Sequence, residues 1–351
     1  MRAERRTLHC VAVRDPGGGD APGSVVGIGA SAGGVDALIR VVRTLPPDFP
    51  AAICIVLHIP SSGRSLLAPI LGRHTDLDVV EAEDGQPLQR GRVYVAPNDR
   101  HLMVSDGLLE LDRGPKENGV RPAVDVTLRA LAAAYGPRAI AVVLSGALGD
   151  GSAGALAVRN AGGLVIVQDP EDATVASMPE SALRAVGRPD ALLPAVDIGP
   201  ALAELVEPAV VVEDRTVMGS TQNPTDASAD RPEGLPSPFT CPECNGSLWD
   251  VQEGQVVRYR CRVGHSYSED AMVIEQGSAV EAALWSALEA LEERAEFLRR
   301  VATRHGDRRP RLRDRFLGAA EDALERAELI RRALGAAGDR PHALDPQAVT
   351  E

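Results

Sequence analysis

The sequence predicts an α/β fold with a doubly wound, mainly parallel sheet, followed by a small zinc-ribbon-like module and an amphipathic helical hairpin. Three observations lead to this prediction. Over residues 24–208, short β-branched apolar runs alternate with stretches of helical spacing, which is typical of parallel α/β domains. Three cysteines and a histidine then gather within residues 240–270. Over residues 271–340, apolar residues recur every three or four positions, as they do in amphipathic helices.

The composition is that of a folded protein with more than one module. The chain has 351 residues, of which 44% are hydrophobic and 25% are charged, so it can bury a sizeable core. Its formal net charge of -13 disfavours nucleic acid and anionic membrane surfaces as partners. The sequence has neither the apolar core of a signal peptide near residue 1 nor a run of about 20 apolar residues that could span a bilayer. We therefore expect a cytoplasmic protein without membrane insertion.

Four apolar runs of the first module are predicted to form its buried strands. They lack polar alternation, as expected for strands that helices cover on both faces of a sheet. The runs are 25–28, 52–57, 139–144 and 164–167, and the segments of helical spacing between them are 35–44, 123–135 and 152–160. The turn sequence Pro97-Asn98-Asp99 predicts a hairpin that pairs residues 93–96 with residues 101–104.

Three further segments are predicted to lie outside the folded modules. Residues 1–23 are expected to form a disordered N-terminal tail, and residues 341–351 a C-terminal tail. Residues 209–239 are rich in turn formers and poor in large apolar side chains, which predicts a flexible linker. The two apolar stripes within residues 271–340 predict an antiparallel hairpin, and the many glutamates around them favour a protein partner for these helices.

A glycine-rich turn follows the first predicted strand and can be interpreted in two ways. As G-x-G-x-x-A, the segment that starts at Gly27 is a dinucleotide fingerprint, whose glycines let a pyrophosphate approach the backbone. As G-x-S-x-G, residues 29–33 form a nucleophile elbow that exposes Ser31. A dinucleotide site needs an acidic residue at the end of the next strand, where this sequence has His58. The histidine favours the elbow, because the ends of parallel strands lie together.

A third strand end supplies a carboxylate. Asp150 follows the strand predicted over residues 139–144, so a serine, a histidine and an aspartate all stand at strand ends. These are the groups of a catalytic triad, in which a carboxylate orients the imidazole that activates the hydroxyl. Asp169 also follows a strand and is the alternative third member. Ser31 and Asp150 could each merely cap the next helix, and it is the coincidence of all three groups that favours catalysis.

With these residues in place, the segment from residue 24 to residue 206 closely resembles the catalytic domain of the chemotaxis protein-glutamate methylesterases, the CheB-type domain. The matching motifs are Gly29-Ala-Ser31-Ala-Gly-Gly, Val56-Leu-His58-Ile-Pro, Val93-Tyr-Val-Ala-Pro-Asn-Asp-Arg-His101-Leu, Arg121-Pro-Ala-Val-Asp125-Val, Leu144-Ser-Gly with Asp150-Gly, and Gln168-Asp-Pro with Met178-Pro-Glu. The resemblance implies a triad of Ser31, His58 and Asp150. The backbone amide of Ala147 is expected to bind the oxyanion, and an amide near Ser31 is a further candidate.

The resemblance also implies an activity and a class of partner. The expected reaction is hydrolysis of glutamate γ-methyl esters on a methylated chemoreceptor or another methylated signalling protein, with release of methanol. No cofactor is needed for such catalysis, and glutamine deamidation is a further activity to test. The alternative is a catalytically weak signalling scaffold or binding protein that uses the same fold.

Two departures from the family pattern bear on this expectation. The family usually has Gly-Met-Gly before the triad aspartate, whereas residues 146–149 read Gly-Ala-Leu-Gly, so Leu148 replaces a glycine beside the expected oxyanion hole. Typical members also carry a phosphorylatable receiver domain first, but only about 24 residues precede the first strand here. We therefore expect a stand-alone form that is not controlled by phosphorylation within the same chain.

The cysteine-containing module predicts a structural zinc site. It has C-x-x-C followed, after a gap of ribbon length, by C-x-x-x-H, and the expected ligands are Cys241, Cys244, Cys261 and His265. Three thiolates and an imidazole suit tetrahedral Zn2+ and leave no position for water, so a structural rather than a catalytic metal is expected. Arg258, Arg260 and Arg262 are expected to make the surface of the module locally basic.

Overall fold

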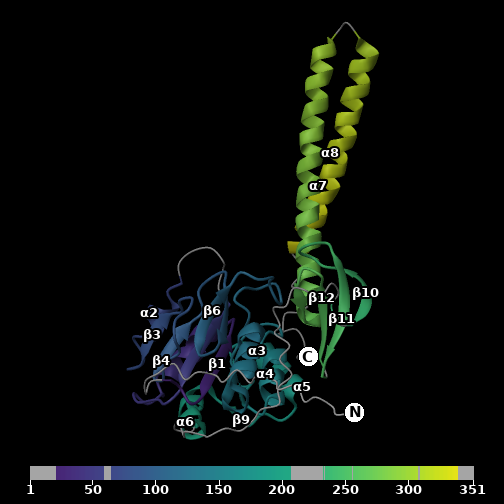
Figure 1. Cartoon of the computed structure of the whole chain (residues 1–351). Helices are drawn as coiled ribbons and strands as arrows, with labels where there is room; N and C mark the ends of the chain where they lie inside the picture. Colours follow the sequence, from purple (N-terminus) through teal and green to yellow (C-terminus); the bar gives the residue numbers. More distant parts are fainter. Residues whose placement is uncertain are drawn as a thin grey trace, which may run out of the picture. The chain divides into compact units, whose positions relative to one another are not determined.

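Seven parallel strands form the central sheet of the protein (Figure 1). Across the sheet they lie in the order β3-β4-β2-β1-β7-β8-β9. Their bounds are β1 Val25–Ala30, β2 Ala52–Leu57, β3 Asp78–Glu81, β4 Arg92–Val95, β7 Ala139–Val143, β8 Leu164–Gln168 and β9 Ala191–Leu193. From β1 the chain moves outward in both directions, through β2 on one side and β7 on the other. The predicted doubly wound parallel fold is confirmed.

This computed structural model describes residues 21–58, 65–206, 232, 234–254, 256–306 and 309–338. The chain folds into two compact units, Met1–Ala271 and Met272–Glu351. The helices that accompany the central sheet are α1 Gly34–Val42, α2 Leu67–Leu71, α3 Val124–Tyr135, α4 Ser152–Asn160, α5 Ser177–Val186 and α6 Ala195–Leu205, with a 3-10 turn at Gly136–Arg138. In the described part of the chain, no helix is long and apolar enough to cross a membrane.

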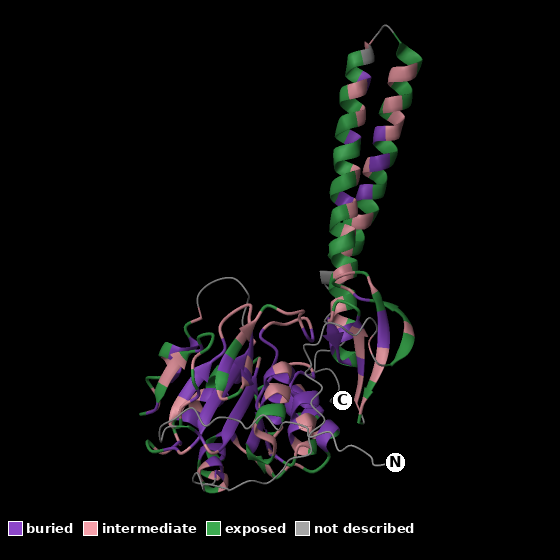
Figure 2. Ribbon diagram, in the orientation of Figure 1, coloured by how far each residue is buried: buried purple, intermediate pink, exposed green. Residues whose placement is uncertain are grey.

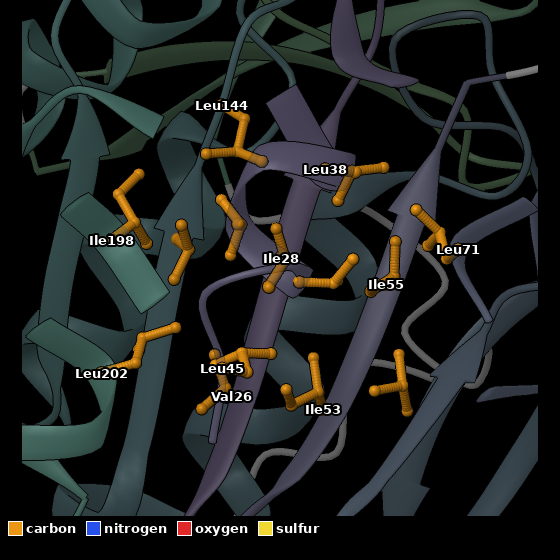
Figure 3. Packing of buried hydrophobic residues seen from close by; sticks show 14 of the residues in the cluster. Val26, Ile28, Leu38, Leu45, Ile53, Ile55, Leu71, Leu144, Ile198 and Leu202 are labelled. Carbon is orange, nitrogen blue, oxygen red and sulfur yellow. The ribbon is translucent and has the colours of Figure 1, made fainter. Parts of the chain in front are cut away.

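Each face of the central sheet packs against its own layer of helices. On β1, Val26 and Ile28 face the layer of α1, α2 and α6 (Figure 3). Val25 faces the opposite layer of α3, α4 and α5. Buried residues consequently fill the central strands on both faces (Figure 2). Gly29 belongs to this packing, because a methyl group at its Cα would collide with Val124 of α3.

The hairpin predicted between residues 93–96 and 101–104 is wrong. Residues 92–95 form β4, which pairs in parallel with β2 and β3 inside the central sheet. β5 (His101–Ser105) instead pairs in antiparallel fashion with β6 (Leu108–Asp112). Asp106 and Gly107 connect these strands with φ values of 50° and 78°. Aspartate followed by glycine is the sequence that such tight hairpin turns prefer, and it overrides the turn signal at residues 97–99.

A small antiparallel sheet forms the second part of the first unit, and we call it the ribbon. Its strands, in order across the sheet, are β10 Leu235–Thr240, β11 Ser247–Glu253, β12 Val256–Cys261 and β13 Ser266–Tyr267. The prediction of a linker over residues 209–239 is wrong at its end, because residues 235–239 belong to β10 and pair with β11. Residues 209–231 of that linker, residues 1–20 of the N-terminal tail and residues 341–351 lie outside the described residues.

Two long helices follow the ribbon, as the periodicity predicts. They are α7 Glu269–His305 and α8 Pro310–Gly338. Ala295 of α7 packs with Ala320 and Ala323 of α8. An ion pair between Glu292 and Arg331 joins the same two helices. The contact position moves back along α7 from Ala295 to Glu292 as it moves forward along α8 from Ala320 to Arg331, so the two helices form an antiparallel hairpin.

Candidate active site

Three polar residues stand where neighbouring strands of the central sheet end. Ser31 follows β1, His58 follows β2, and Asp150 lies in the loop after β7. The register pairs Ala30 with Leu57, so Ser31 and His58 are the first residues beyond a paired position. Because β1 also pairs with β7, all three residues are at the carboxyl edge of the sheet, where parallel α/β folds hold their ligands.

The imidazole of His58 is bound to Asp150. Its Nε2 lies 2.7 Å from Asp150 Oδ2, so Nε2–H donates to the carboxylate and Nδ1 remains as the acceptor nitrogen. The amides of Val124 and Asp125 also donate to Asp150, over 2.7 and 3.0 Å. Burial opposes the charge of Asp150, but the hydrogen bonds from His58 and these amides outweigh it and hold the pKa of the carboxyl far below its ordinary value. Asp150 is therefore a fixed anion that orients the imidazole.

Ser31 lies in the tight turn between β1 and α1. Its amide donates to Ser145 O over 2.9 Å, and its carbonyl accepts from the amide of Gly34 over 2.8 Å. Gly33 makes the turn with a φ of 72°, which glycine adopts without strain. Among the described residues, no hydrogen bond joins the Ser31 hydroxyl to His58. Such contacts commonly tighten only when substrate is bound.

Asp169, the alternative acid, takes part in a different loop. Its carboxylate accepts a hydrogen bond from the amide of Glu171 over 3.0 Å, and its own amide donates to Leu193 O over 2.8 Å. In the described structure it makes no hydrogen bond with His58. The histidine is thus bound to Asp150 and not to Asp169.

The loop that precedes Asp150 leaves the backbone amide of Ala147 without an acceptor among the described residues. The amides of Gly146 and Leu148 donate to acceptors in the segment 175–177, over 3.0 and 3.1 Å. Within the described part of the chain, the amide of Ala147 between them has no acceptor. Gly146 lies directly against the serine, since a methyl group added to it would come within 2.9 Å of Ser31 Cβ. Ala147 therefore directly follows a residue that packs against Ser31.

Leu148 keeps a backbone conformation that glycine adopts more readily. Its φ is 67°, in the left-handed region where a side chain costs about 1–2 kcal/mol. Replacement of a glycine by leucine at this position thus leaves the loop in a glycine-like conformation. The leucine therefore lowers the stability of the protein, while the backbone of the loop keeps its conformation.

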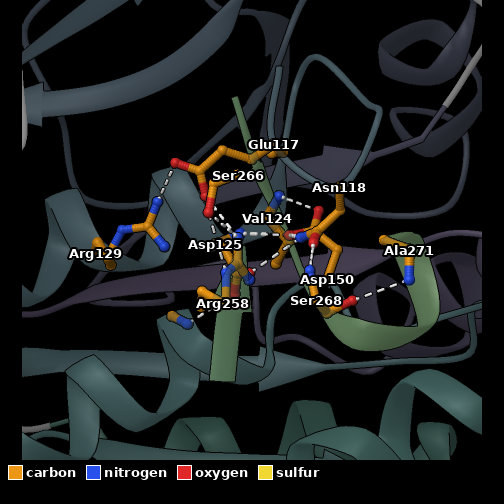
Figure 4. A network of polar contacts seen from close by, with 12 residues as sticks. Glu117, Asn118, Val124, Asp125, Arg129, Asp150, Arg258, Ser266, Ser268 and Ala271 are labelled. Atoms are coloured by element: carbon orange, nitrogen blue, oxygen red, sulfur yellow. Dashed lines mark hydrogen bonds and ion pairs between the residues drawn. The ribbon is translucent and has the colours of Figure 1, made fainter. Parts of the chain in front are cut away.

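Asp150 is surrounded by polar groups that the sequence alone does not connect with it (Figure 4). Asn118 Nδ2 donates to Asp150 Oδ1 over 3.0 Å and to Asp125 Oδ2 over 3.2 Å. Arg258 donates to Asp125 Oδ2 over 2.6 Å from 133 positions further along the chain. Asp125 was visible in the sequence only as part of a motif, and Arg258 only as one of three ribbon arginines. The prediction that Arg258 adds to a basic surface is wrong, because its side chain is buried against these carboxylates.

The four predicted metal ligands come together in the ribbon. Their ligand atoms all lie within 4.8 Å of one another, and this cluster of Cys241, Cys244, Cys261 and His265 could hold a metal ion. His265 Nδ1 lies 3.5 Å from Cys261 Sγ and 3.6 Å from Cys241 Sγ. The sulfur atoms of Cys244 and Cys261 are 3.7 Å apart. Ligands on a tetrahedral zinc ion are about 3.5–3.8 Å apart, so the spacing fits. Glu243 Oε2 lies 3.4 Å from His265 Nε2, where it can orient the ring of the histidine for ligation through Nδ1.

The protein contains a doubly wound parallel α/β domain with a serine, a histidine and an aspartate at the carboxyl edge of its sheet. The model of one family, CheB methylesterase, matches residues 26–202, which is half of the chain. The chain belongs to the CheB methylesterase family.

Proteins from several organisms are similar to this chain over the same domain. It is 43% identical over 188 residues to the protein-glutamate methylesterase/protein-glutamine glutaminase of Thermotoga maritima, covering 52% of this chain and 54% of the relative. It is 41% identical over 181 residues to the protein-glutamate methylesterase/protein-glutamine glutaminase 2 of Anaeromyxobacter dehalogenans, covering 52% and 53%. The chain thus spans about half the length of the curated relatives it matches.

A solved structure is similar to the same part of the chain. The crystal structure of the Thermotoga maritima CheB methylesterase catalytic domain is 42% identical, with a TM-score of 0.50. The match covers 98% of that domain and 52% of this chain. The remainder of the chain, which includes the ribbon and the helical hairpin, lies beyond this likeness.

Proposed function

We propose that this chain is a protein-glutamate methylesterase, which hydrolyses glutamate γ-methyl esters on methylated chemoreceptors or related signalling proteins. The observation that carries the proposal is the 2.7 Å hydrogen bond between His58 and Asp150, at a sheet edge that Ser31 shares. The matches to protein-glutamate methylesterases support the same reaction.

The proposed reaction is an acyl transfer in two steps. Ser31 Oγ attacks the ester carbonyl while His58 Nδ1 takes its proton, and the proton then passes to the methoxy group, which leaves as methanol. Water next attacks the acyl-serine, again with His58 as the base, and releases the glutamate side chain. The free amide of Ala147 would donate to the oxyanion in both steps. Asp150 holds the imidazole and stabilises its charged form.

Glutamine deamidation is a second activity that this site would support. The γ-carboxamide of glutamine presents the same planar carbonyl carbon as the methyl ester, with NH2 in place of the methoxy group, and the same attack would release ammonia instead of methanol. The relatives from Thermotoga maritima and Anaeromyxobacter dehalogenans are named for both activities. Ammonia release from an unmethylated receptor is the measurement that tests this activity.

The metal of the ribbon is proposed to be a structural Zn2+. Three sulfur atoms and one imidazole nitrogen at tetrahedral spacing match the ligand preference of zinc and leave no open position for catalysis. No metal takes part in the proposed ester hydrolysis.

The helical hairpin is proposed to bind a protein. Its surface exposes large apolar side chains, among them Trp285 at 54%, Phe297 at 65% and Leu329 at 60%. Exposed aromatic groups of this kind are enriched in protein interfaces.

The decisive experiment is methanol release from methylated receptor. Ser31→Ala is expected to lower the rate by at least about 1000-fold, and Asp150→Asn by about 10,000-fold through loss of the correct imidazole tautomer. Asp169→Asn is the matched control, because it removes the alternative acid and should leave the rate unchanged. Equal rates in the wild type and Ser31→Ala would leave only the scaffold function.

A further inference from the structure

Arg258 connects the ribbon to the α/β domain. It lies on β12, and its side chain is buried, with 1% of its surface exposed. Its guanidinium donates to Asp125 Oδ2 over 2.6 Å, to Glu117 Oε2 over 3.1 Å and to Ser266 Oγ over 3.2 Å (Figure 4). Asp125 lies in the first turn of α3, and Glu117 in the loop before it. The ribbon therefore supplies a charge to the layer of the α/β domain that also binds Asp150.

Asn118 makes a second link between the ribbon and this layer. Its amide donates to Ser266 O over 2.7 Å, and its Oδ1 accepts from the amide of Ser268 over 2.9 Å. Both partners belong to the ribbon end of the unit, at and just after β13. These two bonds hold Asn118 in a left-handed conformation, with a φ of 53°. In that conformation its Nδ2 reaches Asp150 Oδ1.

Asp125 and Asp150 are coupled because they share hydrogen-bond donors. Asn118 Nδ2 donates to both carboxylates, over 3.2 and 3.0 Å. The amide of Gly151 also donates to both, over 2.9 and 3.0 Å. Two buried carboxylates held by the same donors repel each other, so the position of Asp150 depends on how the charge of Asp125 is balanced.

Arg258 provides that balance. Burial raises the pKa of Asp125 to about 6, and Asp150 adds to the rise, whereas Arg258 opposes it. The other arginine of the cluster, Arg129, is bound to Glu117. Without Arg258, Asp125 would bind a proton more readily near neutral pH. A proton on Oδ2 would face the Nδ2–H donor of Asn118, and a proton on Oδ1 would face the amide of Gly151, so protonation would weaken one of these hydrogen bonds.

Both links lie close to metal ligands in the sequence. Arg258 lies on the strand that ends at the ligand Cys261, and Ser266 directly follows the ligand His265. The amide of Cys261 donates to His265 O over 3.0 Å, which closes the loop between the two ligands. In small modules of this kind, metal ligation and folding are coupled. The position of Arg258 and of Ser266 should therefore depend on the metal.

We infer that the metal-bound ribbon is a positioning element of the active site, in which Arg258 and the contacts to Asn118 hold Asp150 in the orientation that His58 requires. The inference rests on the proposed function for the reaction that it serves. Arg258 and Asn118 are positioning residues, since they act on the reaction only through Asp150. The metal thus takes part in no step of the reaction, but it influences kcat through the position of Asp150.

The first test compares kcat and KM for methanol release by the full chain and its Arg258→Met variant. A misplaced aspartate should lower kcat by about 10- to 100-fold, because small errors in the placement of catalytic groups have effects of that size. KM should keep its wild-type value, because the receptor-binding surface is unchanged. A wild-type kcat in a variant that has lost Arg258 overturns the inference.

Three further variants separate positioning from general damage. Arg258→Lys keeps the charge but not the planar two-sided contact with Asp125 and Glu117, so its kcat should lie between those of the wild type and Arg258→Met. Asn118→Gly keeps the left-handed backbone and removes the carboxamide, and it should also lower kcat alone. Arg260→Met is the control on the same strand and should retain the wild-type kcat. Equal losses in Arg260→Met and Arg258→Met would overturn the inference.

Removal of the metal tests the link to the ribbon. Chelation of the wild type should lower kcat by at least the factor seen for Arg258→Met, because metal loss releases both Arg258 and the contacts to Asn118; elemental analysis measures the bound metal. Chelation of Arg258→Met should then lower kcat by a smaller factor than chelation of the wild type, because one of the two links is already absent. Two losses that multiply would show separate actions and overturn the coupling.

Amide hydrogen exchange separates this inference from the proposed function. With metal bound, the amides of Asn118, Val124 and Asp125 should be protected, and chelation or Arg258→Met should accelerate their exchange. If this occurs while the wild type releases no methanol from methylated receptor, the coupling holds and the proposed substrate is wrong. If methanol release is normal and these amides exchange equally with and without metal, the coupling is wrong and the proposed function holds.

Discussion

The α/β domain and the ribbon are held together by different forces, although they belong to one unit. The α/β domain buries two layers of aliphatic side chains against both faces of a seven-stranded sheet. In the ribbon, the buried side chains include two cysteines of the metal cluster, Tyr267 and the charged Arg258. Burial of apolar surface stabilises the first region, whereas ligation and ion pairs must stabilise the second.

This difference decides how each region can influence the site. A large apolar core gives the strand ends of Ser31 and His58 a fixed geometry that needs no ligand. The described part of the ribbon buries far fewer large apolar side chains than the α/β domain, so its structure should follow its metal. Because Arg258 and Ser266 of the ribbon bind groups next to Asp150, the triad would combine two rigid members with one that depends on a ligand-stabilised module.

Among the changes considered, loss of one metal ligand should have the largest effect, and it should act on the ribbon without acting on the α/β domain. Cys261→Ser should abolish metal binding and unfold the ribbon, because structural zinc contributes on the order of 10 kcal/mol to folding in small zinc modules. The strands of the central sheet should keep their protection against hydrogen exchange. Elemental analysis and residue-resolved exchange measure the two effects.

Cys54→Ala is the matched control for that experiment. Cys54 is a fully buried cysteine of β2, outside the metal cluster. Its loss should leave the metal content unchanged and cost only about 1 kcal/mol in the core. An equal loss of metal in both variants would mean that the ribbon depends on the core and not on its ligands.

The same difference explains what the sequence could predict. The runs at residues 52–57 and 164–167 are strands because continuous apolar sequence requires cover on both faces. The ligand spacing around Cys241 and Cys261 is also local, so the metal cluster was visible. Arg258 was not, since its partners Asp125 and Glu117 lie 133 and 141 positions away and no local pattern connects them.

Turns show the same limit at a smaller scale. The turn sequence at residues 97–99 did not predict the strand pairing correctly. A local turn signal does not show whether the strand before it pairs with the next strand or with strands elsewhere in the chain. β4 pairs with β2 and β3, which the sequence alone does not bring together. The left-handed conformation of Leu148 was equally hidden, since leucine gives no sign of it.

Leu148→Gly tests a strained loop of the α/β domain outside its apolar core. Relief of left-handed strain gains about 1–2 kcal/mol, whereas the added freedom of glycine in the unfolded chain costs about 0.5–1 kcal/mol. The free energy of unfolding should therefore rise by about 0.5–1 kcal/mol, which urea denaturation measures. Leu156→Gly is the control, since Leu156 is also half-buried but lies inside α4, where glycine should lower stability. Equal losses in both variants would show that the conformation of Leu148 carries no strain.

The smallest expected effect concerns the stability of the α/β domain at low pH. Asp172 binds Arg40 over 2.6 Å and accepts hydrogen bonds from Gln168 and the amide of Ala195, each over 2.8 Å. Burial opposes the charge of Asp172, but these contacts outweigh it and lower the pKa of the carboxyl. A carboxyl whose pKa is lowered by folding stabilises the protein above its ordinary pKa of about 3.9 and loses that contribution as the pH falls below it.

Asp172→Asn should therefore cost about 0.5 kcal/mol of unfolding free energy at pH 7, the scale of a partly exposed ion pair. Wild type and variant should converge as the pH approaches 3, since the wild-type carboxyl then loses its charge. Denaturant titrations at both pH values measure the difference, and Asp36→Asn on the exposed side of α1 is the control. A difference that stays constant between pH 7 and pH 3 would assign the effect to packing and not to charge. Convergence would mean that acid weakens this domain one carboxylate at a time, whereas the ribbon should fail in a single step when its ligands are protonated and the metal leaves.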